Sequence, residues 1–269
     1  GTYGISGARM LNCTFRNLTA EGGWVAWGVF GTNLNKSFRF ENCRLNRIDV
    51  HFHCWNLSIC NCTIGFKGIS VTGGGELLIE NTTRHGNTFI SFRRDYGAKW
   101  DGPIRIRGCT LRPTSDGAVT VVSMKPSDFD YQYPIGLGAS IDLEDMTIDY
   151  AAAPSSTASC WLMAIPPFSR NQHGQRLFFP QRLLFRNIRV ANREKGVRLL
   201  SIQDPHHYDL RRAGGCDENR IDPNCTLICD MVQLERTTPA KPGDVRECHL
   251  VLGGDSDADD ADSLALYPQ

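Results

Sequence analysis

A short alternating apolar phrase returns eight times along the chain. In each copy an alternating apolar stretch leads into Asn, Asp or Gly, and then into Cys, Met or another small or apolar residue. Alternate side chains of a strand point to opposite faces, so the phrase predicts a strand that ends at a polar turn. The copies occupy residues 10–13, 40–43, 59–62, 79–82, 106–109, 143–146, 185–188 and 228–231.

The spacing of the copies predicts a solenoid. Turn positions 42, 61 and 81 are separated by 19 and 20 residues, which indicates the length of a bare rung. Later copies stand 27–43 residues apart, which indicates loops inserted at rung corners. Each unit also holds a second apolar stretch, such as 69–71 or 90–92. We therefore predict an all-β fold, a parallel β-helix (β-solenoid) of about eight rungs with loop insertions at the later rungs.

The turn residue of the phrase has a physical reason. Asn tolerates left-handed backbone geometry and hydrogen-bonds neighbouring backbone, so it suits a tight corner. We predict that the side-chain amides of the first four corner residues stack as a ladder inside the solenoid. These residues are Asn12, Asn42, Asn61 and Asn81. The following residue should point inward, where a free Cys behaves as a small hydrophobe. If the Asn61 amide is buried and bonded, its replacement by Ala would cost about 1–3 kcal/mol.

Composition narrows the class of protein. The 269 residues carry 29 basic and 29 acidic side chains, which gives no support for nucleic acid or a charged membrane as partner. No apolar run approaches the length of a membrane span, so no membrane insertion is expected. Residues 1–250 are predicted to form the β-helix domain, and 251–269 an acidic, flexible tail with five carboxylates within 255–262.

The eleven cysteines are an odd number, so they cannot all pair within one chain. Free thiols are the default interpretation and favour assembly in a reducing cytoplasm. Cys216, Cys225 and Cys229 lack the spacing of a zinc ribbon, and the tail lacks the EF-hand pattern. No metal and no cofactor is therefore expected.

The start of the chain carries no signal peptide, since residues 1–4 lead almost directly into a rung. A bare terminal rung would expose unpaired strand edges. The sequence is therefore expected to be part of a longer protein, with a missing upstream domain.

Residues 49–54 give the best candidate site. Val50, Phe52 and Cys54 suit the core, which would place Asp49, His51 and His53 outward in one row. Two rungs on, Arg93 would face outward, next to a loop that runs to residue 102. Small side chains at 70 and 72 would leave a shallow floor between the two sides. The candidate catalytic residues are Asp49, His51, Asp95 and Asp101, and the candidate ligand-binding residues are His53, Arg93, Arg94, Tyr96 and Trp100.

This set suits a sugar polymer. Tyr96, Trp100 and Trp55 would supply apolar faces, and an Arg can hold a uronate carboxylate with a forked pair of bonds. Glycoside hydrolysis needs two carboxyl groups, whereas uronate elimination needs a base and a cation. The alternative is a polar, solvated sheet face without a ligand. Whether this protein is an enzyme stays open; an enzyme would be a polysaccharide lyase or a glycoside hydrolase.

The stretch 33–113 resembles the β-helix block of phage and prophage tail appendage and tail-spike-like proteins. The resemblance is carried by 45–51, 61–64, 79–83, 94–97, 100–102 and 104–110. Such proteins are similar to pectin-lyase-like right-handed β-helices and commonly trimerise. Many bind cell-surface polysaccharide, and some cleave it. The resemblance therefore implies a right-handed β-helix, a homotrimer, a polysaccharide partner, and a location in the virion or outside the cell.

The leading hypothesis is a tail-spike-like β-helix module that recognises, and in some cases depolymerises, a cell-surface polysaccharide. One alternative is a non-catalytic β-solenoid that acts as a spacer or assembly module. Another is a free-standing bacterial polysaccharide lyase or glycoside hydrolase. An assay with purified glycans would separate these hypotheses. Formation of products would support an enzyme, binding without products would support a recognition module, and neither result would leave the structural spacer.

Overall fold

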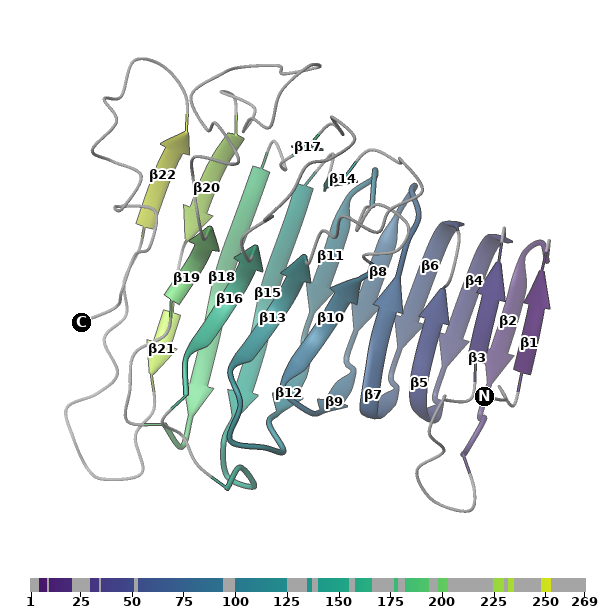
Figure 1. Cartoon of the computed structure of the whole chain (residues 1–269), viewed down its shortest axis with the longest axis horizontal. Helices are drawn as coiled ribbons and strands as arrows, with labels where there is room; N and C mark the ends of the chain where they lie inside the picture. The colour runs from purple at the N-terminus through teal and green to yellow at the C-terminus, as the bar shows by residue number, and fades with distance from the viewer. Residues whose placement is uncertain are drawn as a thin grey trace, which may run out of the picture.

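The computed structural model describes fifteen segments of the chain. They are residues 5–8, 10–20, 30–33, 35–50, 53–93, 100–124, 135–136, 140–154, 158–165, 177–178, 182–193, 198–202, 225–229, 232–234 and 248–252. Every regular element within them is a β-strand, and no helix occurs there. The strands lie side by side along the long axis of the molecule (Figure 1).

The strands form three ladders in which equivalent strands of successive turns pair in parallel. The first ladder runs along one side and uses the first halves of β15 and β18. Its strands are β2 (Cys13–Arg16), β4 (Asn35–Glu41), β6 (Cys54–Cys60), β8 (Leu77–Glu80), β11 (Ile104–Arg107), β15 (Ser140–Asp149), β18 (Arg182–Ala191) and β20 (Cys225–Cys229).

The second ladder is short and uses the later halves of β15 and β18. Its strands are the starts of β5 (Arg44–Val50) and β7 (Thr63–Val71), then β9 (Thr83–His85), β12 (Thr110–Arg112) and β21 (Val232–Leu234). The third ladder consists of β1 (Ile5–Ala8), β3 (Phe30–Asn33), the ends of β5 and β7, β10 (Thr88–Phe92), β13 (Val119–Met124), β16 (Cys160–Ile165) and β19 (Arg198–Ile202).

Two further pairings lie outside these ladders. β14 (Ile135–Gly136) pairs in parallel with β17 (Leu177–Phe178), and β22 (Cys248–Leu252) runs antiparallel to β20. The chain thus passes through the first, second and third ladder in turn, which is the arrangement of a parallel β-solenoid. The predicted all-β, parallel architecture is confirmed, while the count of about eight rungs and the right hand stay predictions.

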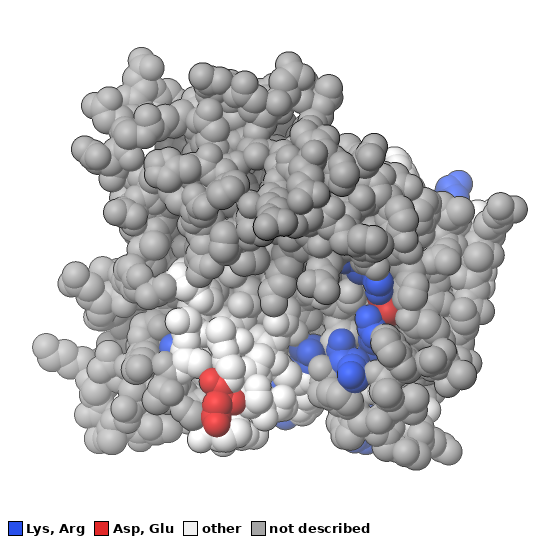
Figure 2. All heavy atoms as spheres, viewed as in Figure 1, with Lys and Arg blue, Asp and Glu red and all other residues white. Residues whose placement is uncertain are grey.

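The third ladder faces the viewer in Figure 1, and Figure 2 shows the same face as a surface. Basic side chains gather there over β5, β7 and β10, with an acidic side chain among them (Figure 2).

The core lies between the three ladders and is built from stacked apolar columns. In the first ladder Leu57 lies opposite Leu77, and Ile59 lies opposite Ile79, all of them fully buried. In the third ladder Ile48, Ile69 and Ile90 form the equivalent column. Each rung therefore buries its apolar face only against its neighbours, which is why repetition is needed for stability.

The corner residues between the first and second ladders adopt the left-handed backbone geometry. Asn42 and Asn61 both have φ of 54°, and Gly108 has φ of 59°. The same geometry occurs at Asn12, Asn81, Asp145 and Asn187. The predicted internal amide ladder is nevertheless wrong, because the side chains of Asn61 and Asn81 are exposed. The left-handed corner turns its own side chain toward solvent and the next side chain into the core.

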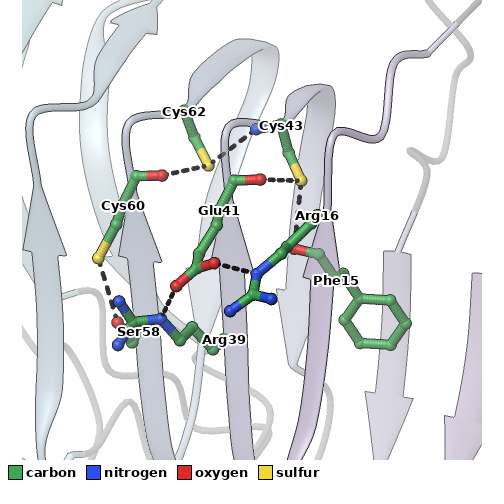
Figure 3. Close-up of polar contacts among 8 residues, drawn as sticks. All are labelled: Phe15, Arg16, Arg39, Glu41, Cys43, Ser58, Cys60 and Cys62. Atoms are coloured by element: carbon green, nitrogen blue, oxygen red, sulfur yellow. Dashed lines mark hydrogen bonds and ion pairs between the residues drawn. The ribbon is translucent and has the colours of Figure 1, made fainter.

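The residue after the corner points inward, as predicted. Cys43, Cys62 and Cys109 are buried, and each thiol donates to the carbonyl two residues earlier at 3.2–3.3 Å. Figure 3 shows this bond for the first two. Burial raises the pKa of the Cys62 and Cys109 thiols to about 12, so they remain protonated donors at neutral pH. The following cysteines are free thiols: Cys13, Cys43, Cys54, Cys60, Cys62, Cys109 and Cys160.

The outward face of the first ladder carries a column of charges. Arg16 and Arg39 both pair with Glu41, the contacts drawn in Figure 3. Farther along the ladder Glu144 receives Arg107 and Arg186, each at 3.2 Å. Such exposed pairs contribute about 0–1 kcal/mol each to stability. Their main effect is therefore to favour pairing of the correct neighbouring strands.

The corner geometry gives a first prediction. Asn61→Ala forces an alanine into the left-handed region and should lower the free energy of unfolding by about 1–2 kcal/mol. Asn61→Gly should change the free energy of unfolding by less than about 0.5 kcal/mol, because glycine adopts this geometry freely. Urea unfolding followed by circular dichroism measures both. Equal losses in the two variants would show that the Asn61 side chain itself, and not the backbone geometry, stabilises the corner.

Candidate functional site

The structure describes five of the nine predicted site residues. Asp49, His53, Arg93, Trp100 and Asp101 lie within the described segments. The other four, His51, Arg94, Asp95 and Tyr96, lie outside the described residues. The site is therefore built here from the first group and from the residues that contact it.

Asp49 and Arg93 lie together, as the pattern of alternate rungs predicted. Ile48 and Val50 occupy the core, so the Asp49 side chain points to the outer side of the third ladder. Arg93 Nη1 lies 2.6 Å from Asp49 Oδ1, although the two residues are 44 positions apart. Ser70 separates their rungs, and its short side chain leaves the guanidinium room to reach across.

A second guanidinium completes this arrangement. Arg47 Nη2 lies 2.7 Å from Asp49 Oδ2, so both carboxylate oxygens are held by arginines. The Asp49 side chain is 0% exposed, and the arginine side chains are 15% and 16% exposed. The predicted exposure of Asp49 is therefore wrong. Sequence reasoning missed Arg47, although its position two residues before Asp49 puts both side chains on one face of the strand.

The structure also corrects the placement of Trp100. This residue was predicted to offer an exposed apolar face to a sugar, but it is 0% exposed and part of the core. Its Nε1–H donates to the Gly75 carbonyl at 3.0 Å. The indole packs where Gly73 has no side chain, since a Cβ there would lie 2.7 Å from Trp100 Cζ3.

Trp55, which was also predicted to offer an apolar face, is exposed. It follows the buried Cys54 at the start of β6, and 53% of its surface is exposed. The ring of half-buried His53 lies 6.2 Å from the Trp55 ring, tilted by 37°. An exposed indole offers an apolar face together with an N–H donor to a ligand.

Asp101 lies on the other side of Gly74 from Trp55. A Cβ at Gly74 would be 3.5 Å from Trp55 Cζ3 and 3.5 Å from Asp101 Cβ, so a side chain there would fill the space between indole and carboxylate. Asp101 is exposed, and its N–H donates to the Gly73 carbonyl at 3.0 Å. We call His53, Trp55, Gly74 and Asp101 the Trp55 strip. The sequence analysis did not identify this gap.

The Trp55 strip combines the groups that bind sugars. An exposed indole packs against the apolar C–H face of a sugar ring, while a carboxylate accepts hydrogen bonds from its hydroxyls. The imidazole of His53, beside the Trp55 ring, can donate or accept a hydrogen bond. These groups are therefore chemically suited to contact a sugar.

Comparisons with known proteins point the same way. The chain is 25% identical over 122 residues to the capsule KL64-specific depolymerase of Klebsiella phage P510. It is similar to a phage capsule depolymerase. The alignment covers 41% of this chain but only 12% of that relative, so the chain spans a small part of the relative's length. No protein-family model matches the chain, and no solved structure matches it.

Two further observations bear on partners and cofactors. Within the described segments no group of three His, Cys, Asp or Glu side chains is arranged to hold a metal ion. In the same segments no helix is long and apolar enough to cross a membrane. The parallel strands and the likeness to a capsule depolymerase together fit a phage tail-spike-like β-helix.

Proposed function

We propose that this chain is a module of a phage tail-spike-like protein that recognises a bacterial capsular polysaccharide. The likeness to a capsule-specific depolymerase and the parallel strands support this assignment. In this proposal the solenoid is right-handed and pectin-lyase-like, belongs to the virion and assembles as a homotrimer. The proposal also includes an upstream domain in the same, longer spike protein.

One observation carries the proposal. The half-exposed Trp55 lies beside Asp101 across the side-chain-free Gly74, on the outside of a rigid stack of strands. Trp55 belongs to β6, while Gly74 and Asp101 each follow a residue that is bridged to the neighbouring rung, Gly73 and Trp100. This stacking limits the cost of ordering the strip on binding. A capsule chain would lie with one sugar ring over the indole and its hydroxyls toward Asp101.

Cleavage of the bound chain is the finer part of the proposal. Asp101 is the exposed carboxylate of the strip, whereas Asp49 is closed off by Arg47 and Arg93. Hydrolysis needs a second carboxyl group about 5–9.5 Å from the first. Asp95 is the predicted partner, with His51 as the predicted base for an elimination. Loss of product formation in Asp101→Asn, but not in the surface control Asp116→Asn, would support chemistry at this site.

The proposal is tested by the change Trp55→Ala. We expect this variant to bind capsular polysaccharide at least about tenfold more weakly, because a buried indole contact contributes more than about 1.4 kcal/mol. Trp55→Phe, which keeps an aromatic face, should lose less. Glycan-array and calorimetric binding to purified capsules, the KL64 type included, measure the effect.

Thermal melts supply the control for folding, and Trp55→Ala should melt within a few degrees of the unchanged protein. Unchanged binding by Trp55→Ala would move the ligand away from the strip. If the properly assembled wild-type protein binds no capsule, the hypothesis that remains is a structural spacer.

A further inference from the structure

A cleft of about 320 Å³ lies on the outward face of the first ladder, away from the Asp49 cluster. Its size is within the range of small-ligand pockets, about 300–1,000 Å³. Ser37 lies opposite Asn56, and Ser58 lies between Arg39 and Leu78, so the lining side chains come from adjacent strands on one face. We call the set the first-ladder cleft, and its main members are Ser37, Arg39, Asn56, Ser58, Glu76 and Leu78.

The charges at the cleft are compensated within the protein. Arg39 pairs with Glu41, and Arg105 Nη1 lies 2.6 Å from Glu76 Oε1. Arg16 shares Glu41 with Arg39 at the rim. The charged side chains of the lining itself are Arg39 and Glu76, one of each sign, so the lining carries no net charge. What remains for a ligand is a set of short hydroxyl and amide groups together with the second oxygen of Glu76. Such a lining suits a hydroxyl-rich, uncharged molecule.

The polar groups of the cleft are held in place before any ligand arrives. The Glu76 N–H donates to Asn56 Oδ1 at 2.8 Å, and Asn56 Nδ2 donates to Ser37 Oγ at 3.4 Å. Since the Ser37 oxygen accepts this bond, its own O–H can donate into the cleft. A fixed array of this kind reduces the ordering cost of binding.

The cleft adjoins the Trp55 strip along the chain and in space. Asn56 follows Trp55 on β6, and Glu76 follows the glycine corner that contains Gly74. Gly75 has φ of 67°, and a Cβ there would lie 2.5 Å from Asn56 Oδ1. This glycine therefore allows the corner to pass close to Asn56 and brings the two surfaces together.

We propose that the first-ladder cleft is a second sugar subsite, which binds an uncharged, hydroxyl-rich unit next to the unit held by the Trp55 strip. This inference rests on the proposed function and adds to it the path of the glycan and the chemistry of one of its units. The glycan runs from the corner at Gly74 across β8, β6 and β4, with Glu76 and Ser58 as hydrogen-bonding partners.

The test fills the cleft with a side chain and varies the length of the glycan. The probes are KL64 capsule oligosaccharides of one repeat unit and of several units, and calorimetry measures their binding. Ser58→Tyr should weaken binding of the long oligosaccharide about tenfold and leave binding of the short one unchanged. Thr110→Tyr, at a half-buried outward position on β12 of the second ladder, is the matched control and should bind both as the unchanged protein does.

A second variant and a salt titration keep the test decisive if Ser58→Tyr folds poorly. Glu76→Gln keeps the shape of the cleft and should lower the affinity for the long oligosaccharide several-fold. The extra affinity of the long over the short oligosaccharide should not depend on salt, because an uncharged unit is not screened.

The outcomes separate this inference from the proposed function. If Trp55→Ala loses binding while Ser58→Tyr and Glu76→Gln behave like Thr110→Tyr, the cleft is not a subsite and the Trp55 strip stands alone. Extra affinity that falls steeply with salt would mean an acidic unit and would overturn the uncharged assignment. A wild-type protein that binds neither oligosaccharide, nor any other capsule, would remove the proposed function and the subsite with it.

Discussion

Replacing Asp49 with alanine is expected to lower the free energy of unfolding by about 3–5 kcal/mol. Asp49 is fully buried and holds Arg47 and Arg93 at 2.7 and 2.6 Å. Without the carboxylate the two guanidinium groups would face one another with no charge between them. Because each keeps some exposure to water, we expect the lower half of this range.

Urea unfolding and thermal melts measure this loss, with Asp116→Ala as the control at an exposed carboxylate. A double-mutant cycle with Arg93→Ala isolates the pair, since removal of Arg93 should relieve part of the repulsion in Asp49→Ala. A loss no larger than that of Asp116→Ala would contradict the buried ion cluster. It would also reopen Asp49 as an accessible acid for catalysis.

Trp100→Ala should destabilise the protein by about 3–5 kcal/mol, the usual cost of removing a large buried aromatic side chain. Its indole is fully buried against the rung at Gly73, and its Nε1–H bonds the Gly75 carbonyl. Trp55→Ala, by contrast, should change the free energy of unfolding by less than about 1 kcal/mol, because most of a surface side chain's contacts are with water.

The two tryptophans thus separate stability from binding. Thermal melts and capsule binding on the same four variants, Trp55→Ala, Trp55→Phe, Trp100→Ala and Trp100→Phe, give the full comparison. Trp100→Phe should recover part of the stability, since it keeps a ring in the core and loses only the hydrogen bond. A Trp100→Ala protein that melts normally and fails to bind would place Trp100 at the sugar and contradict its burial.

The sequence was most informative about features that repeat from rung to rung. The alternating phrase that begins at Ile59 predicted a strand, and the residues after the corners, Cys43 and Cys62, were correctly expected in the core. The direction of Asn61 was missed because its left-handed geometry was recognised without its consequence for the side chain. In that geometry the corner residue turns outward and its successor turns in.

The site was harder to predict than the fold for a physical reason. The meeting of Asp49 and Arg93 follows from the rung repeat alone, and it was expected. The burial of Asp49 involves the two guanidinium groups that hold it, and a repeat pattern does not encode how Arg47 folds over its neighbour. The burial of Trp100 depends on Gly73, whose missing side chain makes room for the indole.

The outward charges of the first ladder also bear on how such a molecule changes over evolution. Along this column Glu80, Arg107, Glu144 and Arg186 occupy successive turns in register. Deleting the turn of Arg107 would set two acids side by side, and deleting that of Glu144 would set two bases side by side. Loss of a whole turn and slippage by one turn during folding are both penalised there. Variation between related chains should therefore concentrate in the loops between turns.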